Sequence, residues 1–183
     1  MDFWTSIGRI ARNRLAPRSL AKGYSEIAES ARRAEELGYN ALTVPERHFQ
    51  YNGATSYPLV PLAAVACHTR RIRLTTGSFL LPLHDPLRVA QDIAVLDNLT
   101  GGRLMLGFGP GYRPIEFAGF GPPKRTRGAR LMEAVELLRR ALSEDEFSWR
   151  GKFFRYERVR IRPRPLQRPH PPIWLAAGTS LYA

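Results

Sequence analysis

Glycines that could admit a ligand follow two apolar runs of this sequence. Gly77 comes late in the first run, and Gly107, Gly109 and Gly111 lie at the end of the second. Because glycine has no side chain, a ligand can approach its backbone closely. Ligands of parallel α/β proteins bind at the carboxyl ends of the strands. These positions therefore predict a ligand site at that edge of a sheet.

Three consecutive residues that could do chemistry follow another short apolar run. Glu46, Arg47 and His48 supply a carboxylate, a guanidinium and an imidazole, and only Pro45 separates them from residues 41–44. An arginine cannot act as a base at neutral pH, but it can hold an anion or polarise an oxygen. A purely structural alternative is an ion pair between Glu46 and Arg47, with His48 capping the loop.

The elements that would position these residues alternate between strand and helix. Residues 72–111 form the centre, with a strand, a helix and a second strand, which is a βαβ unit with parallel pairing and a right-handed crossover. The expected strands are 2–5, 41–44, 72–81, 104–108 and 171–180, the expected helices are 24–37, 58–68, 86–99 and 130–142, and residues 109–125 and 147–163 are expected to form a long loop and a small hairpin.

This alternation is typical of two α/β architectures, a doubly wound sheet and a (β/α) barrel. A dinucleotide-binding fold would place G-x-G-x-x-G after its first strand, at the start of a helix. Here the glycine-rich segment follows the fourth predicted strand and opens a long loop. The pattern disfavours the dinucleotide fold but leaves the two architectures open.

Length and composition predict one domain, residues 1–183, because the chain is long enough for one well-buried core and short for two. A single cysteine, Cys67, excludes a disulfide framework and a cysteine-based metal site within one chain. We expect no metal and a cytoplasmic protein. The first residues lack a long apolar core, so we also expect no signal peptide and no membrane contact.

The net charge of +12 is unusual, and all but three of the 28 basic residues are arginines. A positive surface can attract nucleic acid, and the segment Arg150 to Arg168 places aromatic residues between basic ones, as in some single-strand binders. The arginines are spread along the chain, however, and the alternation in this segment fits a hairpin with one solvated face. We therefore predict no nucleic-acid partner.

The blocks ERHF, TTGSFLLPLHDPLRVAQDIAVLDNLTGGRLMLGFGPGYRPIEF and DEFSWRGKFFRYERVRIRPRPLQRPHPPIWLAAG carry a family resemblance. They resemble the bacterial luciferase-like, flavin-dependent monooxygenases over about residues 24–180. The resemblance implies an α/β fold of the (β/α)8 TIM-barrel type, and this chain would end after about the fifth strand of that barrel. We expect such an open half-barrel to expose its edge strands and to assemble, as a homo-oligomer or with another chain.

The resemblance also implies roles for particular residues. It implies a catalytic turn made of Glu46, Arg47 and His48, although the family often has histidine where this sequence has Arg47. It implies a backbone bulge beneath the flavin ring, often with a non-proline cis peptide, and phosphate donors in glycine-rich segments. The cofactor-binding residues expected on this basis are Thr76, Gly77, Ser78, Gly109, Gly111, Arg113, Gly178, Thr179 and Ser180.

The function implied is that of a flavin-dependent oxidoreductase of the monooxygenase type, which uses reduced FMN and oxygen to oxidise a small organic substrate. A flavin reductase is an expected partner. Two alternatives stay open: a deazaflavin-dependent oxidoreductase, and a truncated, non-catalytic flavin-binding remnant that needs another chain.

Overall fold

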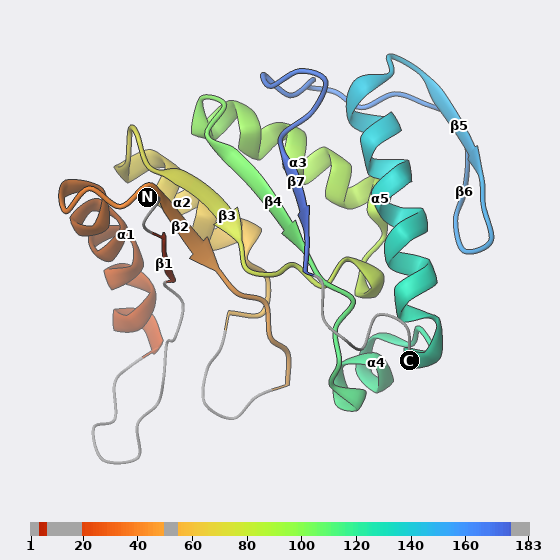
Figure 1. Ribbon diagram of the computed structural model, residues 1–183, viewed down its shortest axis with the longest axis horizontal. Coiled ribbons are helices and arrows are strands. Elements are labelled where there is room, and N and C mark those ends of the chain that lie inside the picture. The colour runs from red at the N-terminus through yellow and green to blue at the C-terminus, as the bar shows by residue number, and fades with distance from the viewer. Residues whose placement is uncertain (1–3, 7–19, 50–54, 177–183) are drawn as a thin grey trace.

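The computed structural model describes residues 4–6, 20–49 and 55–176, and its main sheet has five parallel strands in the order β1-β2-β3-β4-β7 (Figure 1). The strands of this sheet are β1 (Trp4–Ser6), β2 (Ala41–Val44), β3 (Arg73–Thr76), β4 (Leu104–Phe108) and β7 (Ile173–Leu175). The α-helices are α1 (Leu20–Glu36), α2 (Leu59–His68), α3 (Pro86–Thr100), α4 (Pro114–Phe120) and α5 (Arg127–Ser143). Two 3₁₀ turns, Leu81–Leu83 and Lys124–Thr126, and a separate antiparallel pair, β5 (Phe147–Arg150) and β6 (Arg155–Val159), complete the described elements.

Strand order separates the two architectures that the sequence leaves open. The strands lie side by side in their chain order, whereas a doubly wound sheet reverses its order at a switch point. With right-handed crossovers, an unreversed order puts every connecting helix on the same face of the sheet. Helix α1 packs on α2, α2 on α3 and α3 on α5, as one curved outer layer. The arrangement is therefore that of an open (β/α) barrel, as predicted.

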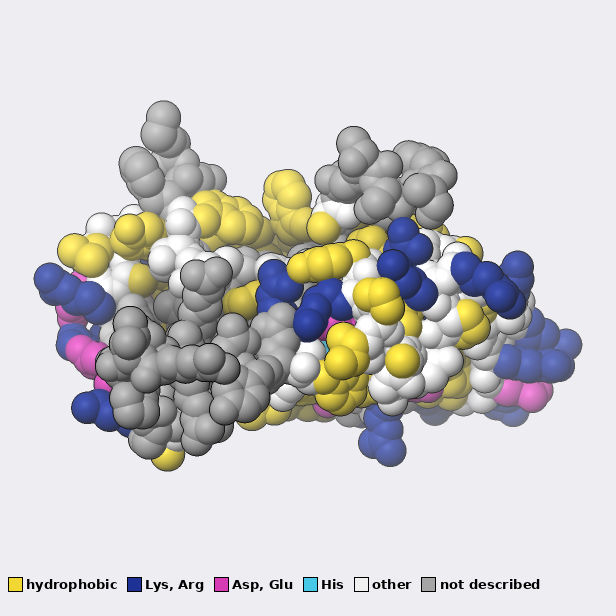
Figure 2. All heavy atoms as spheres, turned by 90° about the horizontal axis from the view of Figure 1, so that it is seen from below, with side chains coloured by type: hydrophobic (Ala, Val, Ile, Leu, Met, Phe, Trp, Pro, Cys, Tyr) yellow, Lys and Arg dark blue, Asp and Glu magenta, His cyan; other side chains and the backbone are white. Residues whose placement is uncertain are grey.

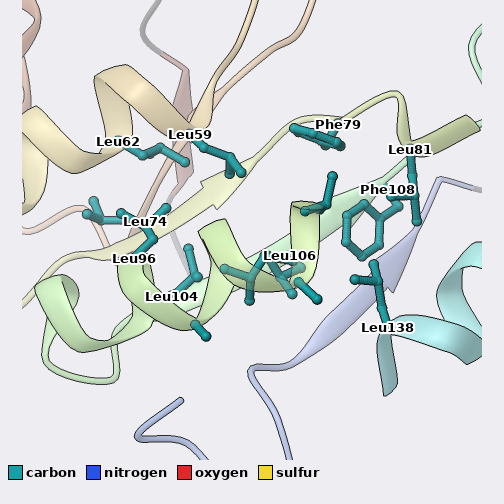
Figure 3. Close-up of a cluster of buried hydrophobic side chains, with 14 of the residues drawn as sticks. Leu59, Leu62, Leu74, Phe79, Leu81, Leu96, Leu104, Leu106, Phe108 and Leu138 are labelled. Carbon is teal, nitrogen blue, oxygen red and sulfur yellow. The ribbon is translucent and has the colours of Figure 1, made fainter. Parts of the chain in front are cut away.

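The main core lies between this helical layer and the sheet (Figure 3). Alternate residues of β4, namely Leu104, Leu106 and Phe108, are buried in it, as the two-residue period of a strand requires. Leu42 and Leu74 of the neighbouring strands join the same cluster. The outer face of the sheet is thus fixed by packing, which leaves the opposite face and the carboxyl edge free for other roles.

Helix α3 shows how local sequence fixes the element at the centre of the chain. The Asp85 side chain accepts hydrogen bonds from the backbone N–H groups of Leu87 and Arg88, and Pro86 occupies the first turn. Gly101 closes the helix in the left-handed conformation, with φ of 64°. The predicted helix 86–99 is confirmed to within one residue.

Two predicted elements need correction. The strand expected at residues 72–81 ends at Thr76, and the apolar residues after it are buried in a turn and a 3₁₀ segment. These residues are apolar because they are buried, and a buried turn can have the same composition as a buried strand. The loop expected at residues 109–125 contains α4, which Pro114 starts and Gly121, with φ of 92°, ends.

The basic hairpin carries acidic partners that the sequence pattern did not suggest. Arg158 and Arg160 both pair with Glu146, and Arg162 pairs with Asp145. The Glu133 carboxylate of α5 accepts backbone N–H groups from the hairpin turn, at residues 152–154. The small hairpin predicted at residues 147–163 is confirmed as the separate pair β5 and β6, and Glu133 holds its turn against α5.

No helix within the described ranges combines the length and the hydropathy needed to cross a membrane.

Candidate functional site

The turns that follow β2, β3 and β4 meet at the carboxyl edge of the sheet, which is the lower edge in Figure 1. The first turn brings Glu46 and His48, the second brings His84, and the third brings Tyr112 and Arg113. Parallel pairing forces all three turns to the same edge, so residues up to 68 positions apart come into contact.

A buried carboxylate joins two imidazoles at the centre of this edge. Oε1 of Glu46 lies 2.5 Å from Nε2 of His48 and 2.6 Å from Nε2 of His84. The other carboxylate oxygen, Oε2, accepts the backbone N–H of Leu80 at 2.6 Å. The Glu46 side chain is fully buried, and those of His48 and His84 are 7% and 14% exposed. We call these three side chains the Glu–His–His cluster.

Hydrogen bonding decides the ionisation of Glu46. Burial alone would raise the pKa of its carboxyl, but the hydrogen bonds from His48, His84 and the Leu80 N–H outweigh burial and lower the pKa. A carboxylate that accepts from both Nε2 atoms fixes those atoms as the protonated ones. The cluster therefore presents a buried anion with a proton held at each imidazole.

The same three residue types can bind a metal ion, and their candidate ligand atoms all lie within 4.8 Å of one another. Two ligands of a tetrahedral zinc, each 2.0 to 2.1 Å from the ion, would lie about 3.3 Å apart. The separations of 2.5 and 2.6 Å from Glu46 to the two histidines are shorter and fit hydrogen bonds. In this arrangement the cluster holds protons between its members.

Aromatic rings enclose the two imidazoles. The His48 ring lies 4.6 Å from that of Phe120, and the His84 ring lies 4.5 Å from that of Phe79 and 5.5 Å from that of Tyr57. Such surroundings limit access of water and strengthen the electrostatic interactions within the cluster. The Tyr57 hydroxyl donates to Asp92 at 2.6 Å; burial, followed by this carboxylate, raises the pKa of Tyr57.

Arg47 and Arg113 flank the cluster, each with its own partner. Arg47 donates from Nη1 to the Tyr112 hydroxyl at 2.9 Å. Arg113 donates to the backbone carbonyl of His48 at 3.1 Å and lies 3.5 Å from the Glu116 carboxylate. Glu116 in turn accepts the backbone N–H of His48 at 3.2 Å. Arg113 and Glu116 thus hold the His48 segment in place.

These contacts contradict the structural alternative of an ion pair between Glu46 and Arg47. Within the described residues, Glu46 bonds to the two histidines and Leu80, whereas Arg47 turns to Tyr112. The reason is geometric, because the side chains of adjacent extended residues leave the backbone in opposite directions. The His48 side chain, for which the alternative is a loop cap, bonds to the Glu46 carboxylate.

The ends of β3 and β4 pack so closely that side chains are excluded. A Cβ on Gly107 would lie 2.2 Å from the Thr76 carbonyl oxygen, and one on Gly109 would lie 2.5 Å from Oγ of Ser78. Oγ1 of Thr76 accepts the Gly107 N–H and donates to the Gly107 carbonyl. The missing side chains therefore let β3 and β4 approach each other closely beside the cluster, and Gly77, directly after β3, is exposed. The peptide bond between Gly77 and Ser78 is cis, as the resemblance implies.

The same contacts correct the expectation that the glycine N–H groups point at a phosphate. The N–H of Gly107 donates to Thr76 at 3.0 Å, and the N–H of Gly109 donates to the Phe79 carbonyl at 2.9 Å. Gly111 is buried with φ of 71°, against the Phe117 ring. The role of Gly109 is therefore steric, because the absence of a side chain leaves room for Ser78. The predicted residues Gly178, Thr179 and Ser180 lie outside the described residues.

Sequence reasoning missed three residues of this site: His84, Tyr112 and Glu116. A usable signal existed for His84, because it is a lone polar residue at the end of the apolar run 79–83, directly before the helix cap Asp85. Glu116 carries the weaker signal of an acid in the first turn of a short helix that Pro114 begins.

A sheet of this order is part of a TIM barrel, and its polar cluster lies at the carboxyl edge, where such barrels bind their ligands. The family model described as luciferase-like monooxygenase matches residues 5–181, and the chain belongs to that family.

Three relatives illustrate the range of the family. The crystal structure of the monooxygenase RslO1 from Streptomyces bottropensis superimposes with a TM-score of 0.92 and 36% identity, over 98% of this chain and 54% of that one. The oxygenase component of the flavin-dependent trigonelline monooxygenase of Acinetobacter baylyi is 30% identical, over 84% of this chain and 43% of its own length. The F420-dependent glucose-6-phosphate dehydrogenase of Amycolatopsis mediterranei is 31% identical, over 88% of this chain and 50% of its own. The chain thus spans about half the length of these relatives.

Proposed function

We propose that this chain supplies the carboxyl-edge half of a flavin-dependent monooxygenase site, which uses reduced FMN and oxygen to oxidise a small organic substrate. The observation that carries the proposal is the exposed backbone of Gly77 after β3, with half-buried Ser78 and Gly107 next to it, beside the buried Glu–His–His cluster. A flat ring system can lie against backbone that carries no side chains.

The residues at the end of β3 and β4 are small enough to let a flavin ring approach the backbone. Gly77 is exposed at the end of β3, and Gly107 and Ser78 are half-buried beside it. These residues, with Thr76 behind them, would hold the ring. When bound, the flavin would supply the electrons that reduce oxygen, and that chemistry belongs to the cofactor.

The protein's own contribution is proton handling and exclusion of water. His48 can give up or accept a proton at Nε2 against the Glu46 carboxylate, with His84 as the second proton holder on the same oxygen. Phe79 and Phe120 cover the two imidazoles. We assign Glu46 and His48 to catalysis, with a flavin reductase as the electron-supplying partner, in line with the relative described as an oxygenase component.

Binding of the cofactor is tested by anaerobic titration of the purified chain with FMN and F420, each oxidised and reduced, followed by absorbance and fluorescence. We expect saturable binding of reduced FMN, and reoxidation in air at a rate that differs from that of free FMN. His48→Gln should change that rate, while His68→Gln, at the exposed end of α2, should not. Preference for F420 would favour the deazaflavin alternative.

The second candidate function is a flavin-binding remnant that needs another chain. Its support is the exposure of large apolar side chains on the two outer strands of the sheet, where Trp4 is 48%, Trp174 58% and Leu175 40% exposed. Flavin binding without any change in the rate of reoxidation would favour this candidate over the enzyme.

A further inference from the structure

We propose that Arg47, together with the hydroxyl of Tyr112, recognises an anionic substrate, and that this substrate carries a carboxylate. The inference deepens the proposed function and rests on it for the identity of the site. Its evidence is independent, because it concerns a charge at the carboxyl edge that has no counterion among the described residues.

Arg47 is a half-buried residue, and the hydrogen-bond partner of its guanidinium is the neutral Tyr112. It donates to the Tyr112 phenol at 2.9 Å, and no Asp or Glu of the described residues forms an ion pair with it. The neighbouring segment, residues 50–54, contains no acidic residue in its sequence. Holding a guanidinium partly out of water without a counterion is unfavourable, so the position favours an anion.

The carboxylates of Glu46 and Glu116, which belong to the same site, already have other hydrogen-bond or ion-pair partners. Glu46 accepts from both imidazoles of the cluster and from the Leu80 N–H. Glu116 accepts the His48 N–H and lies against Arg113. Neither can turn to Arg47 without leaving buried donors unpaired, which is costly.

Arg47 and Tyr112 offer complementary donors. A guanidinium presents a planar fork of N–H groups that matches the two oxygens of a carboxylate. The Tyr112 hydroxyl accepts from Arg47 and keeps its own proton, which it can donate to the same anion. The phenol therefore extends the recognition surface.

Arg47 and Tyr112 lie next to the Glu–His–His cluster, so a substrate bound by them would lie close to the residues assigned to catalysis. Arg47 stands between Glu46 and His48 in the chain, and Tyr112 follows the glycine-rich segment at the end of β4. Seen from the carboxyl edge, Figure 2 shows Lys and Arg side chains next to hydrophobic ones, with a small acidic and histidine surface between them. An anion bound at Arg47 would hold the attached organic group beside the cluster.

The test compares carboxylates with carboxamides of the same shape. Calorimetric titrations of the whole chain would use three pairs: benzoate and benzamide, nicotinate and nicotinamide, acetate and acetamide. We expect at least one carboxylate to bind about tenfold or more tightly than its amide, as a charge-assisted contact should allow. Arg47→Gln should abolish the preference, Arg47→Lys should keep part of it, and Tyr112→Phe should weaken it severalfold.

The matched control is Arg139→Gln, which removes one exposed arginine of α5 and should leave the preference intact. Equal binding of all pairs to the unmodified chain, binding of none, or a preference that survives Arg47→Gln would overturn the inference.

The phosphate of a flavin could use the same donors, so FMN and riboflavin are titrated in parallel. If Arg47→Gln weakens FMN but not riboflavin, Arg47 recognises the cofactor and the substrate inference fails. If flavins do not bind at all while the Arg47-dependent carboxylate preference persists, the proposed function fails and the anion subsite stands.

Discussion

Nε2 of His84 lies 2.6 Å from Oε1 of Glu46, although the two residues are 38 positions apart in the chain. The contact joins the turn after β2 to the end of the turn after β3, and His48 shares the same oxygen. One carboxylate oxygen thus orients two imidazoles at once. Any chemistry at this edge depends on both turns being in place.

Glu46→Gln should destabilise the protein by about 1–3 kcal/mol, as expected when a buried hydrogen-bonding group loses its partner. If the amide oxygen faces the two histidines, the amide NH₂ faces the Leu80 N–H, and two donors confront each other. The measurement is urea unfolding followed by circular dichroism. Glu136→Gln, on the exposed side of α5, is the control and should change stability by less than about 0.5 kcal/mol. Equal effects of the two substitutions would contradict this account of the cluster.

Acid should remove the contribution of Glu46 to stability. Burial alone would raise its pKa, but the hydrogen bonds that Glu46 accepts keep the folded pKa below the unfolded value. A group with a lowered folded pKa stabilises the protein fully above the unfolded pKa, about 4.3, and loses that effect as the pH falls through the folded pKa. The difference in unfolding free energy between the unmodified chain and Glu46→Gln should therefore shrink below about pH 4.3. A difference that stays constant from pH 7 to pH 3 would argue against an ionised Glu46.

Gly109→Ala should destabilise the carboxyl edge, because its Cβ would lie 2.5 Å from Oγ and 3.2 Å from Cβ of Ser78. Overpacking of this kind costs about 1–3 kcal/mol. Ser78→Gly removes the obstructing group, so the double substitution should recover part of the loss, and thermal unfolding of all four chains gives the coupling. Purely additive effects would show that the two residues do not meet.

The outer strands should drive assembly. Trp4 in β1 and Trp174 in β7 are about half exposed on the two edges of the sheet. Unpaired strand edges with large apolar side chains promote association. Sedimentation velocity should show a sedimentation coefficient that rises with concentration, and Trp174→Glu should reduce that rise. Met132→Glu, which changes an exposed apolar residue of α5, serves as the comparison. A single monomeric species at all concentrations would refute the prediction.

The sequence alone predicted the fold well where one rule dominated. The apolar run of β4 and the Asp85–Pro86 start and Gly101 end of α3 are local signals, and each predicted an element at its observed place. The sequence also placed Glu46, His48 and the glycines at one edge, because parallel strands admit no other arrangement. It overextended β3 and missed α4, since an apolar run records burial without saying which backbone buries it.

Tertiary structure alone decided which of these residues meet. Adjacent positions in the chain suggested Glu46 with Arg47, yet Glu46 bonds to His84 and Arg47 bonds to Tyr112. The sequence determined which side chains lie at the carboxyl edge of the sheet, and the local pattern determined the turns in which they lie. The pairing depended on register between strands and on close packing of glycine against Ser78, which are contacts between segments far apart in sequence. No local pattern encodes such contacts, because their energy exists only once the strands have come together.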